Sequence, residues 1–332
     1  MQRVIVSRNP PFVYLFVGGC WYCYDYTSQP LGEGAMGAVY LGFDCSNQDR
    51  VAVKRVKDEY AEIAQVRDCA RREASLRFLH PNIVRMIGLC EYEYGHGPMF
   101  ILSEYIAGIT FDVHVRMRLS LLPADERIIR IVEHIRPVLS ALQYLHNNGV
   151  VHKDIKPSNI MIDSRSCVKL MDLGVANSFR SEAGHMYGFI GTPQYAAPEQ
   201  IADVGAEAVV DPRTDIYSFG VTLYELITGC NPFNGVTESE TLHNQRNLEL
   251  PKNDAIPPGL FAVIARATAK NPDDRYRSAM EMDAELERYL SGARGRKPDS
   301  PETLRIVGAA LAVSLALVLL FAIIIQFIYR CN

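Results

Sequence analysis

The stretch VVHKDIKPSNIMI, residues 150–162, sets a run of polar side chains between two short apolar segments. Apolar flanks of this kind, buried as strands, would present the residues between them as a rigid polar loop. Asp154 can accept a hydroxyl proton, Lys156 can stabilise a phosphoryl group in transfer, and Asn159 offers an oxygen to a divalent cation. Asp172, at the end of the next apolar strand, is a second candidate ligand for such a cation. Taken alone, the stretch is equally compatible with an ordinary polar turn.

A glycine-rich segment, LGEGAMGAVYLGFD, occupies residues 31–44 and passes directly into β-branched and aromatic residues. This composition predicts a hairpin, whereas a dinucleotide-binding motif requires a helix at this point. Glycines in such a hairpin let backbone N–H groups approach phosphate oxygens, although a flexible turn has the same composition. The next predicted strand, VAVKRV (51–56), carries Lys54, and a cation at a fixed distance from the loop favours the phosphate interpretation.

Residues 58–79 contain helix formers and many charges, and they predict one amphipathic helix. Glu73 on this helix lies 19 residues after Lys54, and its carboxylate can pair with the Lys54 ammonium. Most glutamates on helices are simply solvated, so the pairing depends on how the helix packs.

Together these blocks resemble, in order and in spacing, the eukaryotic-type Ser/Thr protein kinases. The resemblance covers about residues 24–290 and is specific, because it consists of a long ordered series of motifs. The series comprises the glycine loop, Lys54 in VAVK, Glu73, HKDIKPSN (152–159), DLG (172–174), APE (197–199), DIYSFG (215–220) and Arg275 in NPDDRYRSA.

The resemblance implies an α+β, bilobal kinase fold within residues 24–290. A small β-rich N-lobe would extend to about residue 103, a hinge would follow at residues 104–107, and a larger helical C-lobe would begin at about residue 108. Residues 1–23 would form an N-terminal extension, which we expect to be a packed segment or a strand because it is apolar and aromatic but too short to span a membrane.

The same resemblance implies a site for ATP and Mg²⁺, with Mn²⁺ as a substitute. Asp154, Lys156 and Thr192 would be the catalytic residues, with Asp154 as the base, and Asn159 and Asp172 would bind the metal. Lys54, held by Glu73, would contact the α- and β-phosphates. The remaining nucleotide contacts would come from Leu31, Gly32, Glu33, Gly34, Ala35, Met36, Gly37, Ala38 and Val39 in the loop, from Ala52 and Met161 around the adenine, and from Glu104 and Ile106 in the hinge.

The acceptor class also follows from the resemblance. Lys156 and the phrase GTPQYAAPE (191–199) are features of Ser/Thr kinases, and the hydroxyl residues Ser178, Ser181, Tyr187 and Thr192 fall within a candidate activation segment. Glu199 would pair with Arg275, and Asp215 would support the catalytic loop, both as architecture.

The sequence departs from the family pattern at several positions. Lys153 replaces the usual arginine, which puts control by loop phosphorylation in doubt because lysine lacks the bidentate fork. Leu173 replaces the common phenylalanine and preserves apolar packing. Ser103 stands where a larger apolar gatekeeper is usual, and the spacing from Glu73 to His80 is about two residues short.

Residues 306–328 (IVGAALAVSLALVLLFAIIIQFI) carry no charge and predict one membrane-spanning helix. The basic linker at 291–305 precedes it and the short tail at 329–332 follows it, so the kinase domain is expected on the cytoplasmic side. A bacterial inner membrane is preferred, and the surface of a eukaryotic organelle is the alternative. Gly308, Ala312 and Ala316 at four-residue spacing could let a second helix approach closely, which leaves a homodimer open.

The composition excludes several other classes of protein. A formal net charge of -4 provides no basic field for nucleic acid, and 48% hydrophobic with 22% charged residues indicates a globular chain. The eight cysteines are scattered, which suits a reducing compartment, and the pair Cys20 and Cys23 has no second pair at zinc-ribbon spacing.

The leading hypothesis is therefore a membrane-anchored Ser/Thr protein kinase that transfers the γ-phosphoryl group of ATP to protein hydroxyls, in signalling and with autophosphorylation. The alternative is a catalytically inactive pseudokinase that acts as a membrane-tethered scaffold, which Lys153 and the short spacing from Glu73 to His80 favour. A kinase for lipids or small molecules is disfavoured by the GTPQYAAPE segment, which shapes a protein-substrate groove in the family.

Overall fold

The computed structural model describes residues 3–34, 37–75, 77–93, 96–172, 192–201 and 210–295. The chain divides into two units, residues 1–289 and 290–332, and helix α9 (Ala279–Gly295) runs across this division into the expected basic linker. Within the described ranges, no helix combines the length and the apolar character needed to cross a bilayer. The predicted span at 306–328 and the tail at 329–332 lie outside these ranges.

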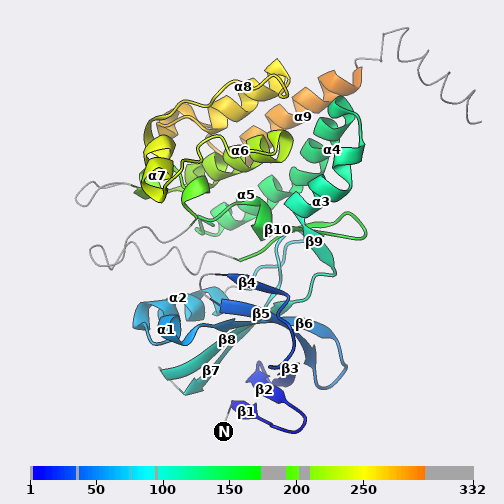
Figure 1. Cartoon of the computed structure of the whole chain (residues 1–332), viewed down its shortest axis with the longest axis vertical. Helices are drawn as coiled ribbons and strands as arrows, with labels where there is room; N and C mark the ends of the chain where they lie inside the picture. The colour runs from blue at the N-terminus through cyan, green and yellow to red at the C-terminus, as the bar shows by residue number, and fades with distance from the viewer. Residues whose placement is uncertain are drawn as a thin grey trace, which may run out of the picture. The chain divides into compact units, whose positions relative to one another are not determined.

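The N-terminal part is a curved antiparallel sheet (Figure 1) whose described strands follow the order β1-β2-β3-β5-β6-β8-β7, with β4 paired to β5. Alternating burial along β2 shows why these residues form strands, because every second side chain enters the core. The strands are β1 (Val4–Val6), β2 (Phe12–Val17), β3 (Cys20–Asp25), β4 (Gly32–Gly34), β5 (Gly37–Asp44), β6 (Arg50–Val56), β7 (Met86–Glu93) and β8 (His96–Glu104).

The N-terminal extension is an integral part of this sheet. It supplies β1, β2 and most of β3, so the expected boundary between residues 23 and 24 falls inside a strand. Strands β1 and β2 also contact β7 at the opposite end of the strand order, which curls the sheet around one apolar core. At Gly88 of β7, an added Cβ would lie 2.7 Å from Val17 Cγ1, so this close approach requires glycine. The first two strands therefore complete the apolar core of the N-lobe by packing against β7.

The helix expected at residues 58–79 is two helices, α1 (Asp58–Ala61) and α2 (Ala64–Ser75). Ala61 and Val66 are both fully buried in one cluster with Ala70. On a continuous helix, residues five apart point about 140° away from each other. The break between the two helices therefore brings both side chains into the same core.

The C-terminal part is helical, as the sequence predicts, and a three-stranded sheet in the order β11-β10-β9 lies beside it. Helix α6 is buried along nearly its whole length, begins at the N-cap Asp211 and ends at Gly229 in the left-handed conformation. The elements are β9 (Gly108–Thr110), β10 (Ile160–Asp163), β11 (Val168–Leu170), α3 (Phe111–Met117), α4 (Ala124–Ile135), α5 (Pro137–Asn147), α6 (Pro212–Thr228), α7 (Glu238–Asn247) and α8 (Pro258–Ala267), with the 3₁₀ turns η1 (Leu119–Leu121), η2 (Pro157–Asn159), η4 (Pro193–Tyr195), η5 (Pro198–Ile201) and η6 (Pro272–Asp274).

Candidate active site

The polar loop between α5 and β10 is held from below by a buried carboxylate. Asp215, fully buried at the start of α6, accepts hydrogen bonds from the backbone N–H groups of His152 at 2.9 Å and Lys153 at 2.7 Å. Its Oδ2 also lies 2.8 Å from Nε2 of His146. Lys153 has a positive φ of 68°, an uncommon conformation for a residue with a side chain, and these bonds hold it there. The loop is therefore a fixed platform.

Asp154 stands at the centre of the site, where three other predicted residues contact it. Lys156 Nζ lies 2.7 Å from Asp154 Oδ2, and the Thr192 hydroxyl donates to Asp154 Oδ1 at 3.0 Å. Lys156 Nζ also donates to Thr192 Oγ1 at 2.6 Å. The Asn159 amide donates to both the backbone carbonyl and Oδ2 of Asp154, at 2.8 and 2.9 Å. The structure thus brings the three predicted catalytic residues and one predicted metal ligand into contact.

Lys54 and Asp172 form the second part of the site. Lys54, in the middle of β6, places Nζ 3.2 Å from Asp172 Oδ1. The positive charge of Lys54 is the main cause that lowers the pKa of Asp172 below its usual value, against the opposing effect of burial. Glu73 lies in α2, but its side chain and the predicted pairing with Lys54 fall outside the described part of the chain.

The glycine-rich segment forms the expected hairpin. Gly34 of β4 is paired with Gly37 of β5, and the tip residues Ala35 and Met36 lie outside the described ranges. A Cβ on Gly37 would lie 2.2 Å from the carbonyl oxygen of Arg55, so β5 and β6 can approach this closely only at a glycine. Within the same ladder Val39 is opposite Lys54, which puts the hairpin directly beside the lysine.

The residues expected around the adenine come from three strands and the hinge. Ala52 of β6 pairs with Ser103 of β8, Met161 lies in β10, and Ile106 is buried in the hinge. The side chain of Glu104 binds other parts of the protein: its Oε1 accepts hydrogen bonds from Lys169 Nζ at 2.6 Å and from the backbone N–H of Arg85 at 2.8 Å. Its carboxylate therefore ties the hinge to β11, the strand that leads to Asp172.

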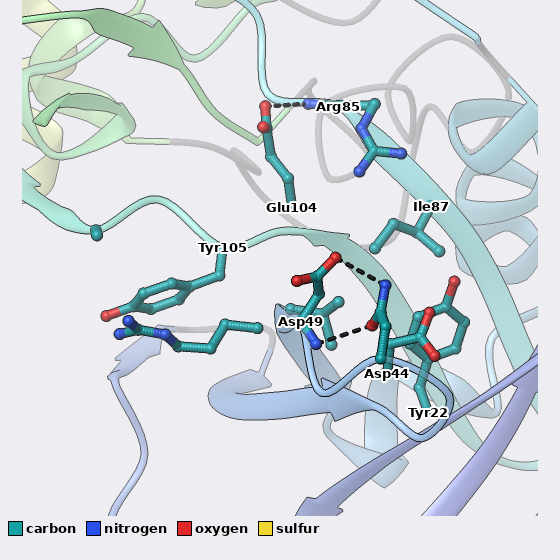
Figure 2. A pocket seen from close by; sticks show the side chains of 11 residues that line it. Tyr22, Asp44, Asp49, Arg85, Ile87, Glu104 and Tyr105 are labelled. Atoms are coloured by element: carbon teal, nitrogen blue, oxygen red, sulfur yellow. Dashed lines mark hydrogen bonds between the residues drawn. The ribbon is translucent and has the colours of Figure 1, made fainter.

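Glu104 also lines a pocket of about 510 Å³ (Figure 2). Among the described residues, Glu104 is the only predicted nucleotide-binding residue that lines this pocket. The others come from β3, from the end of β5 through the turn to the start of β6, from residues 85 and 87 at the start of β7, and from the hinge, and they include Asp44, Arg50 and Tyr105. This pocket is thus distinct from the surface formed by the glycine hairpin and Lys54.

The architectural pair predicted from the APE motif is present and buried. Arg275 Nη1 and Nη2 donate to the two Glu199 carboxylate oxygens at 2.7 and 2.9 Å. Two further contributors were missed by the sequence reasoning. Gln200 accepts from the Ala197 N–H and donates to the Lys153 carbonyl, and His146 contacts Asp215. Lys153 lies 47 positions from Gln200, and Asp215 lies 69 positions from His146, so no local pattern identifies these two contacts.

The expected activation segment lies mostly outside the described residues. Ser178, Ser181 and Tyr187 fall there together with Leu173, and Thr192 is the first described residue after them. Six described cysteines are free thiols, including Cys20 and Cys23, and the described ranges contain no group of three or more His, Cys, Asp or Glu side chains arranged to hold a metal ion.

Comparison with known proteins identifies the family. The family profile described as "Protein kinase domain" matches residues 26–285, which is most of the chain. The chain belongs to the protein kinase family. It is 35% identical over 284 residues to the serine/threonine-protein kinase PknB of Mycolicibacterium smegmatis, covering 82% of this chain and 44% of PknB. It is also 35% identical over 282 residues to the serine/threonine-protein kinase PksC of Streptomyces coelicolor, covering 81% of this chain and 49% of PksC.

A solved structure agrees with this assignment. The crystal structure of the PknI kinase domain of Mycobacterium tuberculosis superposes with a TM-score of 0.60 at 28% identity, covering 82% of this chain and 97% of that domain. The predicted kinase fold, with a β-rich N-lobe and a helical C-lobe, is confirmed. The comparisons also agree with the predicted class of enzyme, an ATP-dependent Ser/Thr protein kinase. The chain spans less than half the length of the two curated relatives.

Proposed function

We propose that this protein is a membrane-anchored Ser/Thr protein kinase that transfers the γ-phosphoryl group of ATP to hydroxyl groups of proteins. The observation that carries the proposal is the contact of Lys156 and Thr192 with the Asp154 carboxylate. A carboxylate in this position accepts the proton of an acceptor hydroxyl, and the adjacent ammonium stabilises negative charge on the transferring phosphoryl oxygens. The names of the relatives support Ser and Thr as the acceptors.

ATP would lie under the glycine hairpin, with Lys54 on its phosphates. The residues proposed to contact ATP are those that the family pattern assigns. The pairing of β5 of the hairpin with β6, the strand of Lys54, supports this position of the nucleotide. Backbone N–H groups and a nearby lysine suit phosphate oxygens.

The residues present fit a magnesium ion. The amide nitrogen of Asn159 is used by two bonds to Asp154, which leaves its Oδ1 available to a cation. The charge of Lys54 lowers the pKa of Asp172 and so favours its carboxylate form, and a carboxylate with an amide oxygen is a donor set suited to Mg²⁺. When bound, the ion would neutralise charge on the phosphates, and Asn159 and Asp172 would hold it.

The membrane part of the proposal rests on the sequence. Residues 306–328 are long enough to cross a bilayer at about 1.5 Å per residue, and the arginines and lysine of the preceding linker favour a cytoplasmic kinase domain, in our proposal at an inner membrane. In the same proposal, the kinase acts in signalling and phosphorylates itself, and two copies pair through Gly308, Ala312 and Ala316 of their spans.

The transfer itself is tested with the purified full chain in detergent, γ-labelled ATP, Mg²⁺ and a histone mixture. Wild type should label Ser or Thr, as phosphoamino-acid analysis would show, and Asp154→Asn should not. Asp68→Asn, an exposed carboxylate on α2, is the matched control and should label normally. Absence of label in a folded wild type that still binds ATP would refute transfer and favour the pseudokinase scaffold, the alternative suggested by Lys153.

The anchor has its own test. The full chain should sediment with membranes and resist carbonate extraction, whereas a chain that ends at residue 300 should not. Protease added to right-side-out vesicles should leave the kinase domain intact if it is cytoplasmic. Release of the full chain by carbonate would contradict the anchor and leave the kinase activity unaffected.

A further inference from the structure

The backbone just after Thr192 is held by side chains from other elements. Residues 193–195 form the short turn η4, which contacts α6 and α7. Its three successive carbonyl oxygens accept from side chains. Gln245 Nε2 donates to Pro193 O at 3.3 Å and also to Gln194 O, Asn231 Nδ2 donates to Gln194 O at 3.0 Å, and Ser218 Oγ donates to Tyr195 O at 2.7 Å. The position of this turn therefore depends on a few specific side chains.

Gln245, on α7, makes the most direct of these contacts because it reaches two consecutive carbonyls. Its side chain is fully buried, so water does not replace a lost hydrogen bond there. Both bonds use its amide nitrogen, and they require that the nitrogen rather than the oxygen of the amide faces η4. A further contact must therefore fix the orientation of the Gln245 side-chain amide.

Tyr217 of α6 fixes it. The Tyr217 hydroxyl donates to Gln245 Oε1 at 2.7 Å, so the amide oxygen points at Tyr217 and the amide nitrogen at η4. Burial raises the pKa of Tyr217 well above its ordinary value, which keeps the phenol protonated as a donor. Tyr217 is itself fully buried and stacks on Phe233.

Lys270 completes the arrangement from the far side. Its Nζ donates to the Tyr217 hydroxyl at 2.9 Å and to the Gln245 carbonyl at 2.9 Å, and it lies 3.8 Å from the centre of the Phe233 ring. The donation directs the Tyr217 proton toward Gln245, because the hydroxyl oxygen is already occupied as an acceptor. The order of donation is thus Lys270 to Tyr217, Tyr217 to Gln245, and Gln245 to η4.

We propose that Gln245 is a positioning residue for protein acceptors, which holds residues 193–195 at the place where the acceptor backbone passes, with Tyr217 and Lys270 fixing its orientation. The inference rests on the proposed kinase activity. Thr192 precedes η4 directly and contacts Asp154, so an acceptor hydroxyl that reaches Asp154 brings its chain against this turn. The nucleotide residues Lys54 and Asp172 contact each other in another part of the site.

The inference predicts a division between the two substrates. Gln245→Met keeps the size of the side chain and removes both donations, and Gln245→Glu keeps the shape and turns an oxygen toward the two carbonyls. In both variants the KM for the histone acceptor should rise about tenfold, because hydrogen bonds from a buried group are lost at the acceptor surface. The KM for ATP should stay within about twofold of wild type.

Matched controls separate positioning from general damage. Asn247→Asp changes an amide to a carboxylate on the same helix at an exposed position, and it should leave both KM values unchanged. All variants are made in the full chain and compared with wild type in steady-state kinetics and thermal unfolding. Lys270→Met should raise the acceptor KM in the same direction as the Gln245 variants, but by less.

Two results would overturn the inference. One is an acceptor KM that stays at the wild-type value in both Gln245 variants, and the other is a parallel rise of the acceptor and ATP KM values together with a lower unfolding temperature.

Amide hydrogen exchange provides a readout that does not need activity. The amides of Tyr195, Ala196 and Ala197 should exchange faster in Gln245→Met, while those of α6 keep their protection. Unchanged exchange at these three amides would overturn the inference even if the wild type proved unable to transfer a phosphoryl group. That inability would by itself refute only the kinase activity.

Discussion

Replacement of Arg275 by Met should unfold the C-lobe at a markedly lower temperature. The guanidinium is fully buried and forms a bidentate pair with Glu199, whose side chain is 8% exposed. It also donates to three backbone carbonyls, those of Ala269 at 2.7 Å, Arg213 at 3.1 Å and Lys270 at 3.0 Å. Methionine fills much of the same volume and replaces none of these bonds.

The magnitude follows from the burial of the pair. Removing one partner of a buried ion pair costs about 3–5 kcal/mol, because the remaining charge stays buried without compensation. The Thr214 hydroxyl still donates to Glu199 at 2.7 Å, so the lower part of this range is expected. For a unit of this size, about 3 kcal/mol corresponds to a fall of roughly 6–12 °C in the unfolding temperature.

Thermal unfolding followed by circular dichroism measures the change, with Arg130→Met as the control. Arg130 pairs with Glu133 at the surface, where an ion pair contributes at most about 1 kcal/mol, so this variant should unfold near wild type. The double variant Arg275→Met with Glu199→Gln should recover part of the loss, since no charge is then left unpaired. The reasoning would be refuted if Arg275→Met lowered the free energy of unfolding by less than about 1 kcal/mol. It would also be refuted if the loss in the double variant equalled the sum of the losses in the two single variants.

Four further predictions follow. Leu15→Ala, inside the N-terminal extension, should cost about 2–5 kcal/mol because Leu15 is fully buried in the N-lobe core, and an unchanged unfolding temperature would mean that the first strands are dispensable. Burial lowers the pKa values of His114 and His134, so on acidification the unfolded chain binds protons at a higher pH than the folded protein does. The free energy of unfolding should therefore fall as the pH drops below about 6.5, and the fall should be smaller in His114→Phe. Unfolding temperatures measured from about pH 7.5 to 5.5 would show both effects. Thr192→Val should lower kcat about 10- to 100-fold through loss of a hydroxyl bonded to charged groups, and Thr192→Ser should retain most of the rate, whereas a normal rate for the valine variant would exclude a role for the hydroxyl. Ser103→Met should weaken ATP-site inhibitors with bulky substituents about tenfold, and equal inhibition would contradict the assignment of Ser103 as a small gatekeeper.

Side chains that are close in the sequence were predicted well. Asp154, Lys156 and Asn159 lie within one loop of six residues, so their proximity follows from the chain itself. The glycine hairpin and the strand with Lys54 were predicted for the same reason, because a tight hairpin fixes its own pairing. The apolar runs at 160–162 and 168–170 were correctly predicted as strands, β10 and β11. The strand predicted on the other side of the loop was wrong, because Val150 and Val151 lie in no strand and the loop follows helix α5 instead.

Local patterns failed where packing decides. The helix at 58–79 was predicted as continuous, and its break depends on which residues of α1 and α2 share a core with β8. The extension at 1–23 was predicted as a packed segment or a strand outside the kinase domain, whereas it supplies strands of the N-lobe sheet, which pair through β3 with β5 and contact β7. Neither result is encoded within a few neighbouring residues, because each depends on surfaces that meet only after folding.

By itself, the sequence determined the family, the order of the motifs and the residue types that the chemistry requires. The resemblance already grouped Thr192 with Asp154, and Lys54 with Asp172, in one site. The tertiary structure supplied the contacts between them across 38 and 118 positions, and it alone decided that Gln245 reaches the turn after Thr192. The physical reason is that these contacts are short-range hydrogen bonds and ion pairs between distant parts of the chain. Their geometry is set by the packing of buried helices and strands, which composition and spacing do not specify.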